Sequence, residues 1–218
     1  MTISPEALAM AAMVEAFVRE VVIPYEQDPR RDHHGAPLDE MVYEMRGHAR
    51  AAGVLTPHIR ADGSHRNQRE TAVILINSGL SPLGPLACNT NAPDEGNMYL
   101  MGHVASPELQ QHFLRPLHEG RTRSAFLMTE PAEEGGAGAD PSMMQTTCRQ
   151  DGNHWVINGR KCFITGFQGA SVGIVMAKAD AGACMFLVDL PDPAIRRSAS
   201  NIYLTPSIPR CRVATPRW

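Results

Sequence analysis

The sequence predicts an α+β protein in which an N-terminal all-α domain precedes a small antiparallel β-barrel domain. Apolar residues recur at helical spacing up to about residue 118, and from residue 123 they alternate with polar residues in short stretches. Because helices and strands occupy separate blocks, the pattern favours α+β over a wound α/β sheet. We expect the helical domain at 1–120, an incomplete β-barrel domain at 121–190 and an irregular basic tail at 191–218.

Four helices are predicted in the first block, over 4–24, 38–53, 67–79 and 106–116. Ser4-Pro5 combines a capping serine with a proline that suits the first helical turn. Gly53 stands where a C-terminal glycine ends the second helix. Asn67 with Glu70 resembles a capping box and favours a third helix, although the apolar residues 73–76 also allow a strand.

Six strands are predicted in the second block, over 123–129, 143–149, 154–157, 160–164, 171–178 and 183–189. Asp151-Gly152-Asn153 supplies one hairpin turn, and Asn158-Gly159 is the pair that a type I′ turn requires. Short strands with such regular turns are typical of a small antiparallel barrel. After residue 192, arginines accumulate without helical or strand period, which predicts a disordered end or, alternatively, a basic tail for an anionic partner.

The composition excludes several classes of protein. The 218 residues carry a net charge of −3, which argues against nucleic acid as the main partner. No apolar run approaches the roughly 20 residues that a membrane helix needs. The N-terminal residues lack the basic and apolar regions of a signal peptide. We therefore expect a cytoplasmic protein without a membrane partner.

Cysteine and histidine spacing predicts neither a disulfide framework nor a metal site. The five cysteines contain no C-x-x-C pair and are expected to be reduced, buried thiols. The closest histidines, His33 and His34, are adjacent and so do not share a helix or strand face.

The segment 124–166 is the most informative part of the chain. A predicted strand ends at Pro131, which has no N–H to continue a ladder. The glycine-rich stretch E-E-G-G-A-G-A-D follows, and glycines let a loop backbone come close to a ligand. The pair Asn158-Gly159 then follows within W-V-I-N-G-R-K-C-F-I-T-G. Together these parts predict the rim of a site for a flat cofactor.

The order of these motifs resembles the acyl-CoA dehydrogenase family, through T-E-P at 129–131 and I-N-G-x-K-x-x-I-T at 157–165. The resemblance implies FAD as cofactor and α,β-dehydrogenation of a fatty acyl-CoA thioester. It also implies that an electron-transfer flavoprotein or similar acceptor takes the electrons and that the protein is a homo-oligomer. The flavin contacts that it implies are Phe126, Met128, Thr129, Phe163 and Thr165. Without the family motifs, both phenylalanines would be interpreted as core residues and Thr165 as a turn residue.

The chain departs from the family pattern at three places. Residues 132–135 are inserted before the glycine loop, and Ala139 stands where a serine often contacts the substrate. The family's catalytic base comes from a C-terminal helical domain, so no catalytic residue is assigned and Glu130 is expected to be structural. After about residue 189 the resemblance ends. A truncated or frameshifted form is one hypothesis; the alternatives are a non-catalytic flavin- or acyl-CoA-binding module and an acyl-CoA oxidase or flavin monooxygenase relative.

Overall fold

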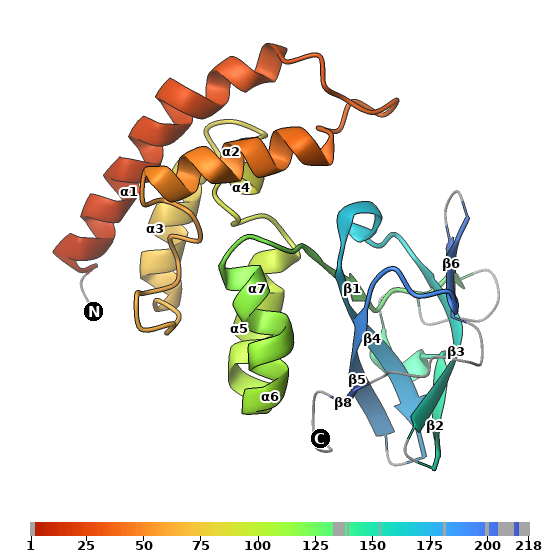
Figure 1. Cartoon of the computed structure of the whole chain (residues 1–218). Coiled ribbons are helices and arrows are strands. Elements are labelled where there is room, and N and C mark those ends of the chain that lie inside the picture. The colour runs from red at the N-terminus through yellow and green to blue at the C-terminus, as the bar shows by residue number, and fades with distance from the viewer. Residues whose placement is uncertain are drawn as a thin grey trace. The chain divides into compact units, whose positions relative to one another are not determined.

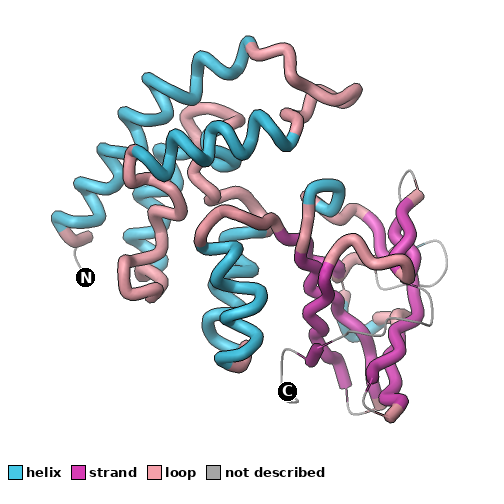
Figure 2. Tube along the Cα trace, in the orientation of Figure 1, coloured by secondary structure: helices cyan, strands magenta, loops and turns pink. Residues whose placement is uncertain are grey.

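The computed structural model describes residues 3–132, 138, 140–152, 154–180, 182–198, 201–204 and 212–213. The chain divides into two compact units, Met1–Glu95 with Pro116–Arg121, and Gly96–Arg115 with Thr122–Trp218. Figure 2 shows that the strands lie in the second part of the chain, after a long helical part. The α+β class is therefore confirmed. No helix in the described ranges has the length and apolar character needed to cross a membrane.

The first unit contains the helices α1 (Pro5–Phe17), α2 (Asp39–Ala51), α3 (Gln68–Ser78) and α4 (Gly84–Ala87) (Figure 1). The predicted caps are confirmed: Ser4 Oγ accepts from the amide of Ala7, and the Asn67 side chain accepts from two amides of α3. Pro24 does not end the first helix, because helical turns continue to Gln27. At Pro24 the missing N–H falls in the first turn of a new 3₁₀ segment, Ile23–Gln27, where proline is tolerated.

Apolar faces of these helices form the core of the first unit. Its fully buried members include Val14 of α1, Met41 and Met45 of α2 and Ile74 of α3. Arg46 is also buried and lies 3.5 Å from Asp94. The Asp94 carboxylate neutralises its charge. The guanidinium also donates to the carbonyl oxygens of Leu86 and Gly120, both at 3.1 Å, and these hydrogen bonds join distant segments of the chain.

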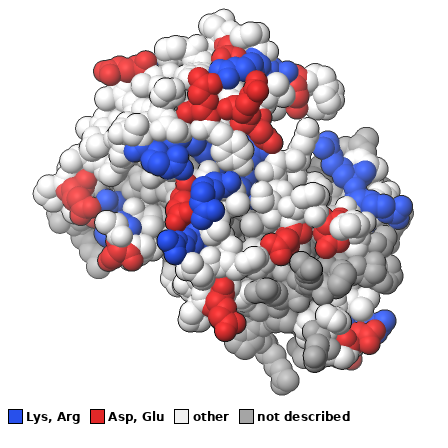
Figure 3. Space-filling model, viewed as in Figure 1, with Lys and Arg blue, Asp and Glu red and all other residues white. Residues whose placement is uncertain are grey.

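Charged side chains of both signs lie close together on the face shown in Figure 3. Arg30 makes ion pairs of 2.7 Å with Asp28 and 2.6 Å with Glu44.

The second unit begins with a helical segment. It contains most of α5 (Asp94–Val104), then α6 (Pro107–Leu109) and a π-helical stretch, Gln110–Leu114, that leads into α7 (Arg115–His118). The sequence prediction missed α5, whose first four residues, 94–97, continue a mostly polar run. The helix nevertheless buries Met98 and Met101, which are each 1% exposed.

The sheet is mixed, and in this respect the predicted antiparallel barrel is wrong. Its strands run in the order β6-β7-β3-β2-β4-β5-β8, and β1 also pairs with β4. β1 and β4 are parallel, because the long segment between them carries the chain back to the same end of the sheet. The strands form an open, curled sheet composed of β1 (Ser124–Leu127), β2 (Thr147–Asp151), β3 (His154–Cys162), β4 (Val172–Ala179), β5 (Gly182–Asp189), β6 (Ile195–Arg197), β7 (Asn201–Leu204) and β8 (Arg212–Val213).

Asn158-Gly159 is not a hairpin turn, which corrects a second prediction. β3 continues through both residues and pairs with β2 up to Asn158 and with β7 from Gly159 onward. A Cβ atom on Gly159 would lie 2.7 Å from Cα of Thr146. Glycine is therefore required there, because two segments of the backbone come close together. At the other predicted turn, 151–153, the described residues Asp151 and His154 pair as the adjoining ends of β2 and β3.

The segment after residue 190 is not irregular throughout. It contains β6 and β7, which pair with each other, and β7 also extends the edge of β3. Ile202 and Leu204 are buried in the core of the second unit, and this alternation supplies the strand signal that the arginines obscured. Residues 205–211 and 214–218 lie outside the described part. Cys88, Cys148 and Cys162 are buried free thiols, as predicted, whereas the free thiol of Cys184 is only half-buried and Cys211 lies outside the described residues.

Candidate functional site

The ends of β1 and β3 lie side by side. The Cys162 amide donates to the Thr129 carbonyl oxygen at 2.9 Å, which fixes the residues after β1 against the last residue of β3. Ala125 and Leu127 are buried in the core of the sheet. Since successive side chains of a strand point to opposite faces, Phe126 faces away from that core. Both Phe126 and Met128 are half-buried.

A buried ion pair stabilises this edge. Lys161 Nζ donates to Glu130 Oε1 at 2.9 Å and to the Met128 carbonyl oxygen at 3.0 Å. The other donors to the Glu130 carboxylate are the amides of Gln145, at 2.7 Å, and Thr146, at 2.9 Å. Burial alone would raise the pKa of Glu130, but hydrogen bonds from Thr146, Gln145 and Lys161 outweigh burial and lower it to about 2. Glu130 is therefore an ionised residue that holds the loop to its neighbours.

Phe163 projects from the same edge. Its backbone has a φ of 55°, in the left-handed region that residues with a Cβ rarely adopt, and its side chain is 84% exposed. The alternative that Phe163 is a core residue is therefore wrong. Strained backbone of this kind concentrates at binding sites. Thr165 is exposed in the turn that follows, and Gly166 completes the turn with a φ of 78°.

The structure thus brings Thr129 and Phe163 together through the backbone. Ala139, the residue expected at the substrate, lies outside the described residues, as do 133–137 of the glycine loop. In the described part of the chain, this edge offers backbone groups, one exposed aromatic ring and threonine hydroxyls. Such an edge can orient a flat conjugated ring and modify its electron affinity.

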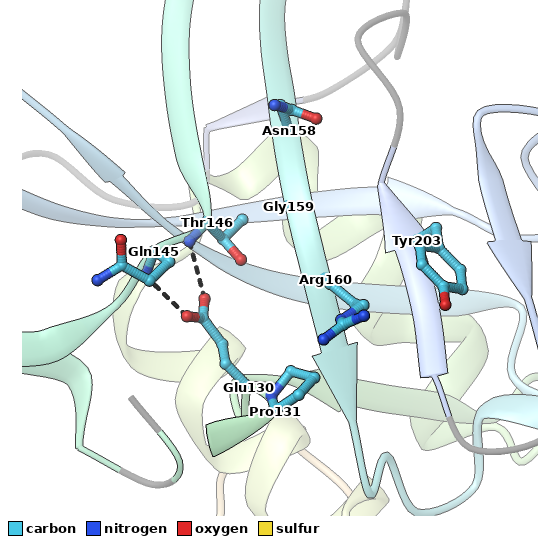
Figure 4. A pocket seen from close by; sticks show the side chains of 8 residues that line it. All are labelled: Glu130, Pro131, Gln145, Thr146, Asn158, Gly159, Arg160 and Tyr203. Carbon is cyan, nitrogen blue, oxygen red and sulfur yellow. Dashed lines mark hydrogen bonds between the residues drawn. The ribbon is translucent and has the colours of Figure 1, made fainter. Parts of the chain in front are cut away.

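A pocket with a volume of ≈ 290 Å³ is bordered by Glu130 (Figure 4). The Arg160 guanidinium carbon is 5.9 Å from the centre of the Tyr203 ring, close enough for a cation–π contact. The pocket is lined by Glu130, Pro131, Gln145, Thr146, Asn158, Gly159, Arg160 and Tyr203. Sequence reasoning did not identify Arg160 or Tyr203; alternation in N-I-Y-L at 201–204 was the signal that could have indicated the latter.

Comparisons with known proteins agree with this geometry. Residues 125–204 match the family described as acyl-CoA dehydrogenase, middle domain. A probable acyl-CoA dehydrogenase of Mycobacterium tuberculosis is 31% identical over 172 residues, which are 75% of this chain and 41% of the relative. The structure of a putative acyl-CoA dehydrogenase from Mycobacterium abscessus superposes with a TM-score of 0.81 at 27% identity, over 100% of this chain and 62% of that one.

An acyl-CoA dehydrogenase complexed with FAD from Bacillus anthracis shares the fold, with a TM-score of 0.74 at 21% identity. The match covers 98% of this chain and 38% of that protein. The chain therefore spans less than two thirds of the length of each of these three relatives. The match to the middle-domain family, the relative from Mycobacterium tuberculosis and the structure from Mycobacterium abscessus together show that the chain is a member of the acyl-CoA dehydrogenase family.

Proposed function

We propose that this chain is the flavin-binding part of an FAD-dependent acyl-CoA dehydrogenase. The observation that carries the proposal is the edge formed by Thr129 and Phe163. There the hydrogen bond from Cys162 to Thr129 joins two strand ends, and an exposed phenyl ring stands beside them. An exposed aromatic side chain on strained backbone is stabilised most when a flat ligand covers it and removes it from water.

The residues present fit FAD. Phe163 would pack on the isoalloxazine ring, while Phe126, Met128 and Thr129 would line it along the strand end and Thr165 would contribute a hydroxyl from the turn. Bound FAD supplies an acceptor for the hydride that leaves the β carbon of the substrate. The chain's own contribution is to orient that acceptor, and the ion pair between Lys161 and Glu130 keeps its strand end in place.

The proposal extends to the substrate, the electron acceptor and the oligomeric state. We propose a fatty acyl-CoA thioester as substrate, with Ala139 near its pantetheine part, and an electron-transfer flavoprotein or similar protein as acceptor. The FAD-bound relative from Bacillus anthracis supports the cofactor at the level of the fold. A homo-oligomer is proposed because FAD in this family also contacts a partner subunit.

One observation favours a second candidate, a non-catalytic flavin- or acyl-CoA-binding module. The carboxylate that borders the edge, Glu130, is engaged by three hydrogen-bond donors and is unsuited to remove an α-proton. An acyl-CoA oxidase or flavin monooxygenase relative would use the same flavin edge with a different acceptor.

Absorbance of the purified chain separates these candidates. A dehydrogenase is expected to show flavin bands that an acyl-CoA bleaches in the absence of air. Retained flavin that no acyl-CoA bleaches would support the binding module, and flavin that is bleached and then reoxidised rapidly by oxygen would support an oxidase. A folded, colourless chain that does not take up added FAD would contradict the proposal.

A further inference from the structure

A cluster of histidine and carboxylate side chains lies in the first unit, far in sequence from the flavin edge. Nitrogen atoms of His58 and His65 and a carboxylate oxygen of Glu95 all lie within 4.8 Å of one another. The two histidines come from the arms of a small hairpin-like loop, in which Ile59 bridges to His65 and the Arg66 amide donates to the His58 carbonyl oxygen at 2.9 Å. Glu95 comes from the first turn of α5.

His65 presents a lone pair to Glu95 when it is neutral. Its Nδ1 lies 2.7 Å from the Arg66 carbonyl oxygen, an acceptor, so Nδ1 carries a proton. The neutral ring then has its unprotonated Nε2 only 3.2 Å from Glu95 Oε1. Two acceptors at that distance require a positive group between them, either a second proton on His65 or a metal ion. A backbone carbonyl that fixes the far nitrogen is also the usual orientation of a metal-bound histidine.

His58 distinguishes the two possibilities. It is 0% exposed, and neither ring nitrogen has a hydrogen-bond partner among the described residues. Its ring centre is 5.2 Å from that of His65. An imidazolium–carboxylate pair between His65 and Glu95 leaves His58 unsatisfied, and an unsatisfied buried polar group is costly. A metal ion bound by all three residues would give one of those nitrogens a partner.

From this geometry we propose that His58, His65 and Glu95 bind one divalent first-row transition metal ion of the Zn²⁺ class. Two imidazole nitrogens and a carboxylate are ligands that Zn²⁺ takes together, and three protein ligands leave a fourth position for water. Bonds of 2.0–2.1 Å at tetrahedral angles place ligand atoms about 3.3 Å apart. The atoms of His65 and Glu95 already have about that spacing, so binding requires mainly a small approach of His58.

His58 is fully buried and neither of its ring nitrogens has a polar partner among the described residues, an environment that disfavours a charged ring and suits the neutral imidazole that binds a metal. The site would fasten the hairpin-like loop to the start of α5. It is independent of the flavin proposal and does not need FAD.

The test uses the full 218-residue chain, purified without a polyhistidine tag and freed of metal with a chelator. We expect elemental analysis to find one equivalent of Zn²⁺. Co²⁺ in its place should give the intense visible absorption bands of a tetrahedral site. Glu95→Gln and His65→Gln, which nearly keep the side-chain volume, should weaken Zn²⁺ binding at least tenfold by calorimetry and abolish the Co²⁺ bands. His34→Gln changes an exposed histidine outside the cluster and should leave both unchanged.

Zn²⁺ should also raise the unfolding temperature of the parent chain and of His34→Gln, but not of a folded Glu95→Gln variant. Absence of Co²⁺ bands in the folded parent chain would overturn the proposal in favour of a His65–Glu95 ion pair. Zn²⁺ affinity that is equal in the parent and the two ligand variants would overturn it as well. If Glu95→Gln fails to fold, the comparison rests on His65→Gln and the parent spectrum.

Discussion

The ammonium group of Lys161 lies 2.9 Å from the carboxylate of Glu130, and the two side chains are 0% and 2% exposed. The pair joins the loop that follows β1 to β3, and the same ammonium group also binds the Met128 carbonyl oxygen. A buried pair with this many hydrogen bonds contributes a fixed geometry more than net stability. It holds the proposed flavin edge in one register.

Replacing Lys161 with methionine should destabilise the protein severely. The change leaves the Glu130 charge buried without its counter-ion, which typically costs about 3–5 kcal/mol. Urea unfolding followed by circular dichroism measures the loss. Lys178→Met removes an exposed lysine from β4 and serves as the matched control, with an expected change of less than about 0.5 kcal/mol. Equal stability of the two variants would show that the buried pair is dispensable.

Glu130 should make the stability depend on pH in the acid range. Its pKa is lowered to about 2 in the folded protein from its ordinary value of 4.5. The folded state therefore gains stability from ionised Glu130 above pH 4.5 and loses it as the pH falls towards 2. The difference in unfolding free energy between the parent and Glu130→Gln should thus be largest near pH 6 and shrink by pH 3. A difference that stays constant or grows on acidification would contradict the assigned shift.

Phe163→Ala should weaken FAD binding without loss of fold. Aromatic contacts contribute about 0.5–1.5 kcal/mol beyond area burial, so the affinity should fall several-fold or more. The side chain is 84% exposed, so its removal opens no cavity in the protein. Fluorescence titration with FAD measures the affinity, and Ile76→Ala, which truncates another exposed apolar residue, is the control. Unchanged affinity for FAD would remove Phe163 from the flavin site.

Turnover by the 218-residue chain alone should be slow even with FAD bound. A positioned general base contributes about 10²–10⁴-fold, and Glu130 is held by hydrogen bonds that keep it from that role. Dye reduction with medium and long acyl-CoA substrates measures the rate, with and without a separately expressed C-terminal helical domain of a relative. A rapid rate from the chain by itself, abolished by Glu130→Gln, would place the base at Glu130.

Local signals predicted much of the fold. Caps such as Ser4 and Asn67 act within a few residues, so their effect is readable from the sequence, and the structure confirms both. Long-range pairing was less readable. Two features depend on which segments of the chain approach one another and not on local turn preference. They are the parallel pairing of β1 with β4 and the continuation of β3 through Asn158-Gly159. In the latter case the contact with Thr146 decides the role of the glycine.

The candidate site was predictable where a motif marked it and not elsewhere. Thr129 and Phe163 were named from family motifs, and the structure joins their backbones through Cys162; their contacts with flavin stay a prediction. Tyr203 and the cluster of His58, His65 and Glu95 were not predicted. The residues around Tyr203 come from positions 130–203 and those of the cluster from positions 58–95, and only the folded chain brings each set together.

The division of β3 between two partners has a mechanical consequence. Cys162 pairs with Asn201 of β7, and its amide donates a hydrogen bond to the carbonyl oxygen of Thr129. Three segments of the chain are therefore connected at this residue. Lys161, the preceding residue, is opposite Ile202 in the same pairing. We therefore expect loosening of 201–204 to disturb the strand end beside Phe163, and so to change FAD affinity at the proposed flavin edge without a direct contact.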